Sequence, residues 1–157
     1  MKQKRRKTYE TKESGFTFVE TLAVLAIGAI LTAAVGLSAV KAVDTARSVS
    51  CAQTVSQYKA ALQAYYVDCG TFPSVQQGLD ALWQKPVLVP VPSNWSGPYV
   101  DKCIQNDPWG NPFVYAQYGS ADFPHDAPSQ VPYVIYSFGA DGVAGGTGKN
   151  EDICSWK

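Results

Sequence analysis

Glu20 is an acidic residue within an apolar stretch of the sequence, a position that suggests a chemical role. Glu20 is the only charged residue from Phe16 to Val40. A carboxylate in such surroundings is costly and calls for a positively charged partner. If the chain is cut after Gly15, the new α-amine of Phe16 lies one helical turn away and is positive near neutral pH. We therefore expect Glu20 to pair with such an amine, in its own chain or in a neighbouring subunit.

A second group of acids lies near the C-terminus, in a glycine-rich segment. Asp141, Glu151 and Asp152 follow a stretch that reads as a strand. Carboxylate and carbonyl oxygens on a flexible loop suit Ca²⁺, which takes six or more such ligands. The spacing is not that of an EF-hand, so two interpretations stay open from the residues alone: a calcium loop, or solvated surface acids.

The four cysteines form neither a Cys-x-x-Cys pair nor a cluster with histidine, so we expect no zinc or redox site. An even number on the exported side of a membrane indicates two disulfides. Cys51 and Cys69 would lie about 27 Å apart along one helix, too far to pair. Two pairings remain open: Cys51–Cys103 with Cys69–Cys154, or Cys51–Cys154 with Cys69–Cys103.

The neighbours His125 and Asp126 resemble part of a catalytic site, but no serine or cysteine stands in a nucleophile context. We expect His125 to be a surface loop residue and the protein not to be an enzyme. The 157 residues carry no net charge, yet residues 1–15 have a net charge of +4 and the remainder −4. A nucleic-acid-binding protein would have a basic body, so this distribution argues against one.

An uncharged and mostly apolar run of 20 residues, 21–40, follows the basic N-terminus. As a helix it would span about 30 Å, the thickness of the hydrocarbon layer of a membrane. It has no polar face, unlike a core helix, and it is longer than the apolar part of a cleaved signal peptide. We expect a retained membrane helix with its N-terminus in the cytoplasm, because basic residues precede it.

The helix is expected to continue beyond the apolar run, over roughly 17–68. Apolar or cysteine residues recur every three or four positions, at Cys51, Val55, Tyr58, Leu62, Tyr65 and Cys69. This spacing predicts an amphipathic second half, which Gly70 and Pro73 end. A short helix over about 75–83 and an irregular proline-rich connection over 86–98 are expected next.

Two strands are predicted in the C-terminal part, over 113–118 and 131–138, because both are rich in Val, Ile, Tyr and Phe. A turn at 107–112 precedes the first strand, and polar loops at 119–130 and 140–152 follow each strand. The expected fold class is α+β, with a long helix covered by a small antiparallel sheet.

The segment Gly15-Phe16-Thr17-Phe18-Val19-Glu20, after a short basic leader, resembles the cleavage signal of type IV pilins and pseudopilins. The resemblance implies that a prepilin peptidase cuts after Gly15 and methylates Phe16, and that Glu20 is the acid that links subunits. It divides the chain into a leader (1–15), a helix half that spans the membrane and forms the filament core (16–40), and a periplasmic globular domain (41–157).

Three further segments resemble the major pseudopilins of type II secretion systems. They are YYVDCGTFPSVQQGLDAL at 65–82, DPWGNPFVY at 107–115, and YSFGADG at 136–142 with Asp152-Ile153. The resemblance implies a type IV pilin-like fold and one structural Ca²⁺. Its ligands would be the side chains of Asp141, Glu151 and Asp152 and the carbonyls of Phe138 and Val143.

The implied function is that of a filament subunit that pushes folded exoproteins through the outer-membrane secretin. Its implied partners are further copies of itself, minor pseudopilins, the prepilin peptidase, an inner-membrane platform with its ATPase, the secretin and the membrane. The chain would cross the inner membrane once before it enters the periplasmic filament. The main alternative is a type IV or competence pilin, which shares the N-terminal signal but usually lacks the DPWG and GADG segments. The alternative from another class is a signal-anchored periplasmic binding module or enzyme that works as a monomer.

Overall fold

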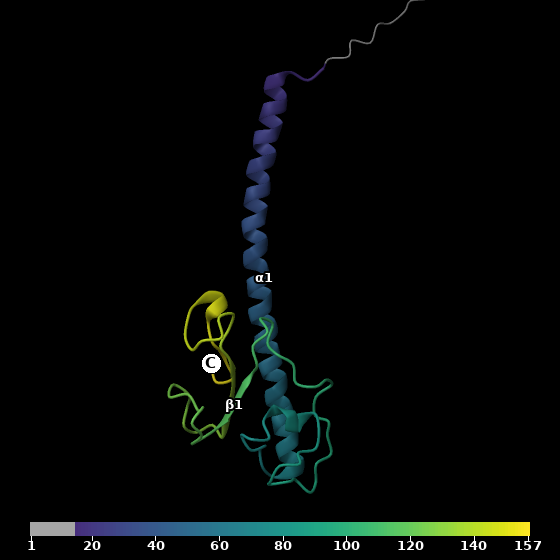
Figure 1. Cartoon of the computed structure of the whole chain (residues 1–157), viewed down its shortest axis with the longest axis vertical. Helices are drawn as coiled ribbons and strands as arrows, with labels where there is room; N and C mark the ends of the chain where they lie inside the picture. Colours follow the sequence, from purple (N-terminus) through teal and green to yellow (C-terminus); the bar gives the residue numbers. More distant parts are fainter. Residues whose placement is uncertain (1–14) are drawn as a thin grey trace, which may run out of the picture. The chain divides into compact units, whose positions relative to one another are not determined.

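The structure is a computed structural model that describes residues 15–157, except for the side chains of residues 34–38. Most of the predicted leader, residues 1–14, lies outside the described residues. The chain divides into two units, Met1–Val40 and Lys41–Lys157. The elements in chain order are α1 (Phe18–Cys69), the 3-10 helix η1 (Leu79–Leu82), β1 (Val114–Gln117), β2 (Tyr133–Ser137), the 3-10 helix η2 (Gly148–Asn150) and β3 (Ile153–Cys154) (Figure 1).

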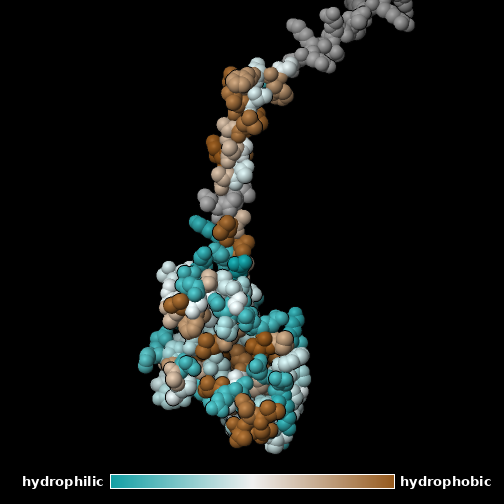
Figure 2. All heavy atoms as spheres, viewed as in Figure 1, coloured by the Kyte–Doolittle hydropathy of each residue, from teal (hydrophilic) through white to brown (hydrophobic). Residues whose placement is uncertain are grey.

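The first unit consists of the N-terminal part of α1, and its large apolar side chains are exposed. Phe16 is 77% exposed, Leu25 69% and Ile30 68%, and apolar residues follow one another along this part of the helix in Figure 2. In the described part of the chain, no helix has a stretch that is both long enough and apolar enough to cross a membrane.

The core of the second unit lies between the C-terminal part of α1 and the sheet. Val55, Tyr58, Leu62 and Tyr65 recur every three or four residues, and each is at most 7% exposed. They pack in one cluster with residues of η1, β1 and β2, which are Leu79, Ala81, Leu82, Tyr115, Tyr133 and Ile135. Burying one such side chain stabilises the fold by about 1.5–3 kcal/mol. The predicted amphipathic face is therefore confirmed.

The sheet has three antiparallel strands in the order β1-β2-β3. Val114 pairs with Tyr136 between β1 and β2, and Tyr136 pairs with Cys154 between β2 and β3. Because side chains alternate between faces, Ile135 packs in the cluster beneath the sheet and Tyr136 in a second cluster on the outer face. Both predicted strands are confirmed. β3 was not predicted, because a two-residue strand carries no readable periodicity.

Ser155 fastens the C-terminal end to both layers of the second unit. Its backbone N–H donates to the carbonyl of Ile135 over 2.9 Å, and its hydroxyl accepts from the N–H of Ile135 over 3.0 Å. Its carbonyl accepts from the ammonium of Lys59 on α1, over 2.8 Å. All three polar groups of one residue are thus used to join the chain end to β2 and α1.

The predicted disulfides are not present. All four cysteines lie in the described part of the chain and are free thiols. Both pairings left open by the sequence join Cys154 to a cysteine of α1. In the structure Cys154 packs on the outer face of the sheet, while Cys69 packs in the cluster on the helix side. The sheet therefore separates Cys69 from Cys154, and a strand of two residues gives no signal of this in the sequence.

The predicted short helix at 75–83 is a turn followed by η1. Ser74 and Gln77 cap this turn reciprocally: the N–H of Ser74 donates to the Gln77 amide oxygen over 2.9 Å, and the N–H of Gln77 to the Ser74 hydroxyl over 3.3 Å. The Gln77 amide nitrogen also donates to the carbonyls of Leu88 and Pro90, over 2.7 and 2.8 Å. One buried side chain therefore fixes the proline-rich connection.

The C-terminal end of α1 is closed by Gly70, as predicted, with φ of 73° and a hydrogen bond from its N–H to the carbonyl of Tyr66. One residue before the helix ends, Asp68 accepts hydrogen bonds from the hydroxyls of Ser96 and Tyr99. The Ser96 hydroxyl, followed by that of Tyr99, lowers the pKa of the Asp68 carboxyl. A negative charge at a helix C-terminus opposes the helix dipole, and these two donors offset that effect.

The change Asp68→Asn is expected to lower stability at neutral pH and to leave it unchanged in acid. A folded-state pKa below the unfolded value of about 3.9 adds stability above that value, and the gain disappears as the pH falls through the folded pKa. Urea unfolding of both proteins as a function of pH measures this, with the exposed Asp101→Asn as control. A stability difference that stays constant down to the most acidic pH would contradict the assignment.

Candidate functional site

The predicted processing site lies just before the first turn of α1. Residues 15–17 have no regular secondary structure, and Gly15 and Phe16 are exposed. A Cβ added to Gly15 would have no described atom within 4 Å. The residues on the C-terminal side of the predicted cleavage point are therefore exposed and lie outside the helix.

Glu20 has a partner in its own chain that sequence reasoning missed. The N–H of Thr17 donates to the Glu20 carboxylate over 3.5 Å, and the N–H of Glu20 donates to the Thr17 hydroxyl over 3.3 Å. This is a capping box, and its signature, Thr-x-x-Glu before an apolar run, is readable in the sequence. Both bonds are longer than usual, so the carboxylate stays available to a closer cation.

The C-terminal loop that carries the predicted calcium ligands begins at Gly139, which is held on two sides. Its N–H donates to the hydroxyl of Ser137 over 3.1 Å, and its carbonyl accepts from the side-chain amide of Asn111 over 2.8 Å. Gly139 has φ of 69°, and a Cβ there would lie 2.9 Å from the backbone of Asn150. Only glycine fits this position without displacing the chain that returns from the loop.

Asp107 connects this loop to the turn at 107–112. The carboxylate is 5% exposed and accepts from the Ser137 hydroxyl over 2.6 Å and from the N–H groups of Trp109 and Asn111 over 3.0 and 2.8 Å. Together, Asp107, Asn111, Ser137 and Gly139 form a hydrogen-bonded set that we call the loop junction. An aspartate at the start of a turn signals the local bonds, but the long-range bond to Ser137 has no signal in the sequence.

The cysteines near this region are poor nucleophiles. Cys51 lies completely buried beside Ser137 and Asp107, and burial raises the pKa of its thiol. Burial also raises the pKa of the Cys154 thiol, to about 11. A raised pKa disfavours the thiolate, which is the form of cysteine that acts as a nucleophile or metal ligand.

The predicted calcium ligands are present on the loop but are not gathered into one site. The Asp141 carboxylate accepts from the N–H of Val143 over 3.2 Å, and that of Asp152 from the N–H of Gly145 over 2.9 Å. The other oxygen of Asp152 is buried and accepts no hydrogen bond from a described residue. Among the described residues, no group of three or more His, Cys, Asp or Glu side chains could hold a metal ion.

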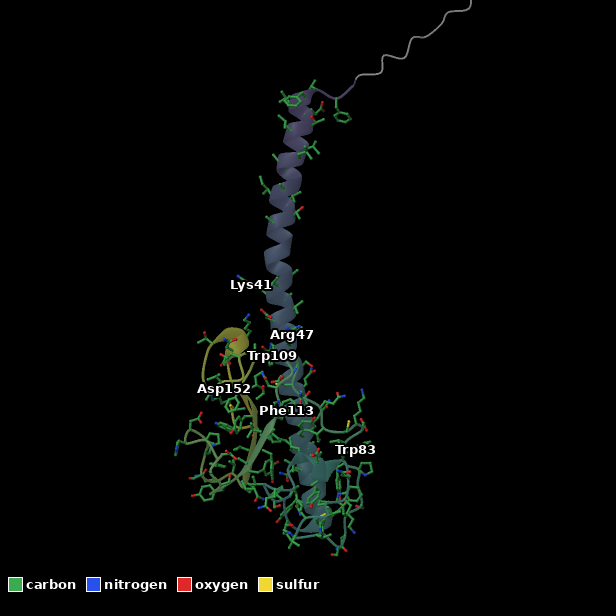
Figure 3. The ribbon with its side chains drawn as sticks, in the orientation of Figure 1. Lys41, Arg47, Trp83, Trp109, Phe113 and Asp152 are labelled. Atoms are coloured by element: carbon green, nitrogen blue, oxygen red, sulfur yellow. The ribbon has the colours of Figure 1, made fainter. Side chains whose placement is uncertain are left out.

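The C-terminal loop fits a calcium ion in its donor types but not in the arrangement of its carboxylates. The donor types suit a hard cation, and the buried Asp152 oxygen lacks the partner that a buried carboxylate requires. The three carboxylates, however, do not meet, and Glu151 is exposed. Figure 3 shows Asp152 beside the C-terminal loop.

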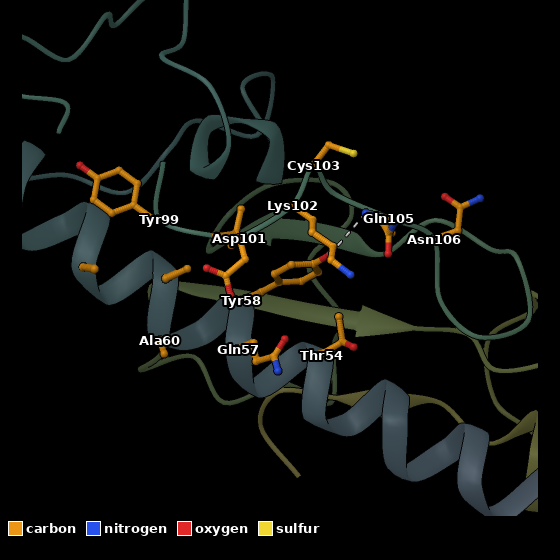
Figure 4. Close-up of a pocket in the computed structure, with 13 residues that line it drawn as sticks. Thr54, Gln57, Tyr58, Ala60, Tyr99, Asp101, Lys102, Cys103, Gln105 and Asn106 are labelled. Carbon is orange, nitrogen blue, oxygen red and sulfur yellow. Dashed lines mark hydrogen bonds between the residues drawn. The ribbon is translucent and has the colours of Figure 1, made fainter. Parts of the chain in front are cut away.

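A groove of about 700 Å³ runs along the exposed side of α1 in the second unit. Thr54, Gln57 and Ala60 line it from the helix, and Asp101 and Lys102 from the segment that covers it (Figure 4). The Tyr58 hydroxyl accepts from the N–H of Gln105 over 3.5 Å across it. Its lining is mixed in polarity and holds no catalytic arrangement.

The change Gly139→Ala is expected to destabilise the protein by more than Gly119→Ala. Gly119 also has a positive φ, of 84°, but a Cβ there meets no described atom within 4 Å. Its substitution should cost only the left-handed strain of about 1–2 kcal/mol. At Gly139 the same strain adds to a clash with backbone. Denaturant unfolding of the two variants measures the difference, and equal losses would contradict the tight closure of the loop.

The chain was compared with known families and proteins. Residues 38–156 match the family "Type II secretion system (T2SS), protein G", and residues 11–36 match the "Prokaryotic N-terminal methylation motif". This chain is similar to two proteins called "Type II secretion system core protein G". The one from Pseudomonas aeruginosa is 37% identical, over 92% of this chain and 96% of the relative. The one from Aeromonas hydrophila is 33% identical, over 92% of this chain and 93% of the relative.

A solved structure agrees with these matches. The crystal structure of the major pseudopilin from the type 2 secretion system of enterohaemorrhagic Escherichia coli has a TM-score of 0.57 and 28% identity, and the match covers 72% of this chain and 85% of that one. The long helix on a three-stranded sheet is therefore the pseudopilin fold. On the match over residues 38–156 and the relatives that span almost its whole length, this chain belongs to the type II secretion system protein G family.

Proposed function

We propose that this protein is the major structural subunit of a type II secretion pseudopilus. The observation that carries the proposal is the family match over residues 38–156 together with the pseudopilin fold of the same region. The type IV or competence pilin alternative is less well supported, because the similar proteins reported above are named for type II secretion.

The membrane and the filament core are the proposed surroundings of residues 16–40. Residues 21–40 carry no charge, and many of their apolar side chains are exposed. Contact of such a surface with water is unfavourable, so lipid or other subunits would cover it. Cleavage after Gly15 and methylation of Phe16 would precede assembly, in keeping with the matched methylation motif. Glu20 would then pair with an α-amine of a neighbouring subunit, in exchange for its bond to Thr17.

The proposed partners follow from this role. They are further copies of the chain, minor pseudopilins, the prepilin peptidase, the inner-membrane platform with its ATPase, and the secretin. The body of the protein would lie in the periplasm and the N-terminus would start in the cytoplasm, since the leader is basic.

A host that lacks this chain is expected to retain its exoproteins in the periplasm, and the full-length chain should restore secretion. Glu20→Ala should not restore it, because a subunit without the acid loses its ionic contact to the next copy. Thr21→Ala, a change in the same turn, is the control. Mass spectrometry should find a mature chain that starts at a methylated Phe16. Normal secretion without the chain, or a mature product without residues 16–40, would contradict the proposal.

We also propose that the C-terminal loop binds a structural Ca²⁺. The proposed ligands are Asp141, Glu151 and Asp152 with the carbonyls of Phe138 and Val143. The support is the oxygen donor set and the Asp152 oxygen that lacks a partner among the described residues. Binding would bring these carboxylates together. The ion would therefore order the part of the loop that follows the loop junction.

Calcium is expected to raise the melting temperature of the protein, and Asp152→Asn should abolish most of the increase. An ion that binds only the folded state adds about 2.7 kcal/mol at a concentration 100 times its dissociation constant. The measurement is calorimetry with calcium and with chelator. The matched control is Asp126→Asn, an acid outside the proposed ligand set, which should keep the full increase. Identical melting curves under both conditions would rule out the site.

A further inference from the structure

A second cavity, of about 300 Å³, lies on the outer face of the sheet, away from α1. The loop that follows β1 contributes Phe123 and Asp126, β2 contributes Tyr136, and the C-terminal segment contributes Asp152 and Trp156. The filament proposal uses none of the aromatic residues of this cavity, and the calcium proposal uses only the backbone carbonyl of Phe138. We call it the outer cavity.

Aromatic rings form the walls of the outer cavity. The rings of Tyr136 and Phe138 have centroids 5.1 Å apart and an angle of 74° between their planes. Those of Tyr136 and Trp156 are 6.0 Å apart at 81°. Rings that meet near right angles present both faces and edges to the space between them, and Phe123 packs against the same cluster. Aromatic faces attract cations through their quadrupole.

Acidic side chains also line the outer cavity. Asp122, Asp126 and Asp152 all line the cavity. Asp122 and Asp126 are exposed, while one oxygen of Asp152 is buried without a hydrogen bond from any described residue. Lys157 lies 3.7 Å from Asp126, but both partners are more than half exposed, and such a pair contributes little. His125 also lines the cavity and is exposed. The acids outnumber the cations, so the field in the cavity favours a positive ligand.

We propose that the outer cavity binds an organic cation, either an alkylammonium or a guanidinium group, such as the side chain of a lysine or arginine. Aromatic walls with carboxylates at the edge are the arrangement that recognises such groups. Aromatic walls offer no oxygen ligands to a bare metal ion, whereas their faces attract an organic cation. The cavity also has room for several methylene groups, which the rings can cover.

This inference does not depend on the proposed role in secretion, because binding of a cation by one chain requires no assembly. It does share Asp152 and Phe138 with the proposed calcium loop. The binding measurements are therefore made in the presence of a chelator, which removes calcium and leaves only the organic cation to bind.

The test is a titration of the mature full-length chain in detergent micelles, followed by the NMR signals of its ¹⁵N-labelled tryptophan indoles. The change Trp156→Phe identifies the Trp156 signal. The cationic probes are Nα-acetyl-lysine methylamide, Nα-acetyl-arginine methylamide and tetramethylammonium, and the neutral control is Nα-acetyl-norleucine methylamide. We expect saturable shifts of the Trp156 signal with a cationic probe and a dissociation constant in the millimolar range.

The three probes separate the possible sources of the cation. Binding of the lysine or arginine probe indicates a polypeptide ligand, and binding of tetramethylammonium alone indicates a small quaternary ammonium compound. Both results support the proposal. No saturable shift with any cation, or the same affinity for the norleucine probe, overturns it.

Matched variants locate the binding. Phe123→Leu removes an aromatic wall but keeps an apolar side chain, and should weaken binding about threefold. Tyr118→Leu removes a ring that contacts Phe123 from outside the cavity and should leave affinity unchanged. Asp126→Asn should weaken binding about fivefold, whereas Asp101→Asn, on another surface, should not. Equal effects within either pair of variants would place the cation elsewhere and overturn the proposal.

Discussion

A single buried carboxylate, that of Asp107, holds the functional end of the second unit together. It accepts two backbone N–H groups of its own turn and the hydroxyl of Ser137, at the end of the central strand. A buried carboxylate depends on its hydrogen-bond partners, and leaving a buried acceptor unpaired costs about 1–3 kcal/mol. Because Ser137 and Asn111 in turn hold Gly139, the start of the C-terminal loop is fixed by the same carboxylate. The DPWG and GADG segments are thus one structural feature.

Much of this fold could be predicted from local pattern. The helix face of Val55, Tyr58, Leu62 and Tyr65 follows from a spacing of three and four residues, and β1 and β2 follow from their composition. These features are visible because one buried face repeats along the chain.

What could not be predicted depends on contacts between distant segments. β3 has two residues, and its orientation decides that Cys154 faces away from α1. The predicted Cys69–Cys154 bond is absent for that reason, since helical spacing excluded a bond between Cys51 and Cys69 but could not place Cys154 on a face of the sheet. The long-range bonds of the loop junction and of Ser155 join residues 20 to 96 positions apart, and no periodicity in the sequence predicts them. The capping box of Thr17 and Glu20 is different: it is local, and its signature was present in the sequence.

Asp152 links the two cation sites proposed for the C-terminal region. Its buried oxygen is an uncompensated acceptor on a residue that belongs both to the loop and to the outer cavity. A calcium ion on this carboxylate would neutralise part of the negative charge that favours an organic cation in the cavity. By reciprocity, an organic cation in the cavity would weaken calcium by the same factor. The carboxylate is one residue from β3 and three from Ser155, which is bonded to α1 through Lys59. Either cation would therefore act on the segment through which Ser155 joins the chain end to the helix.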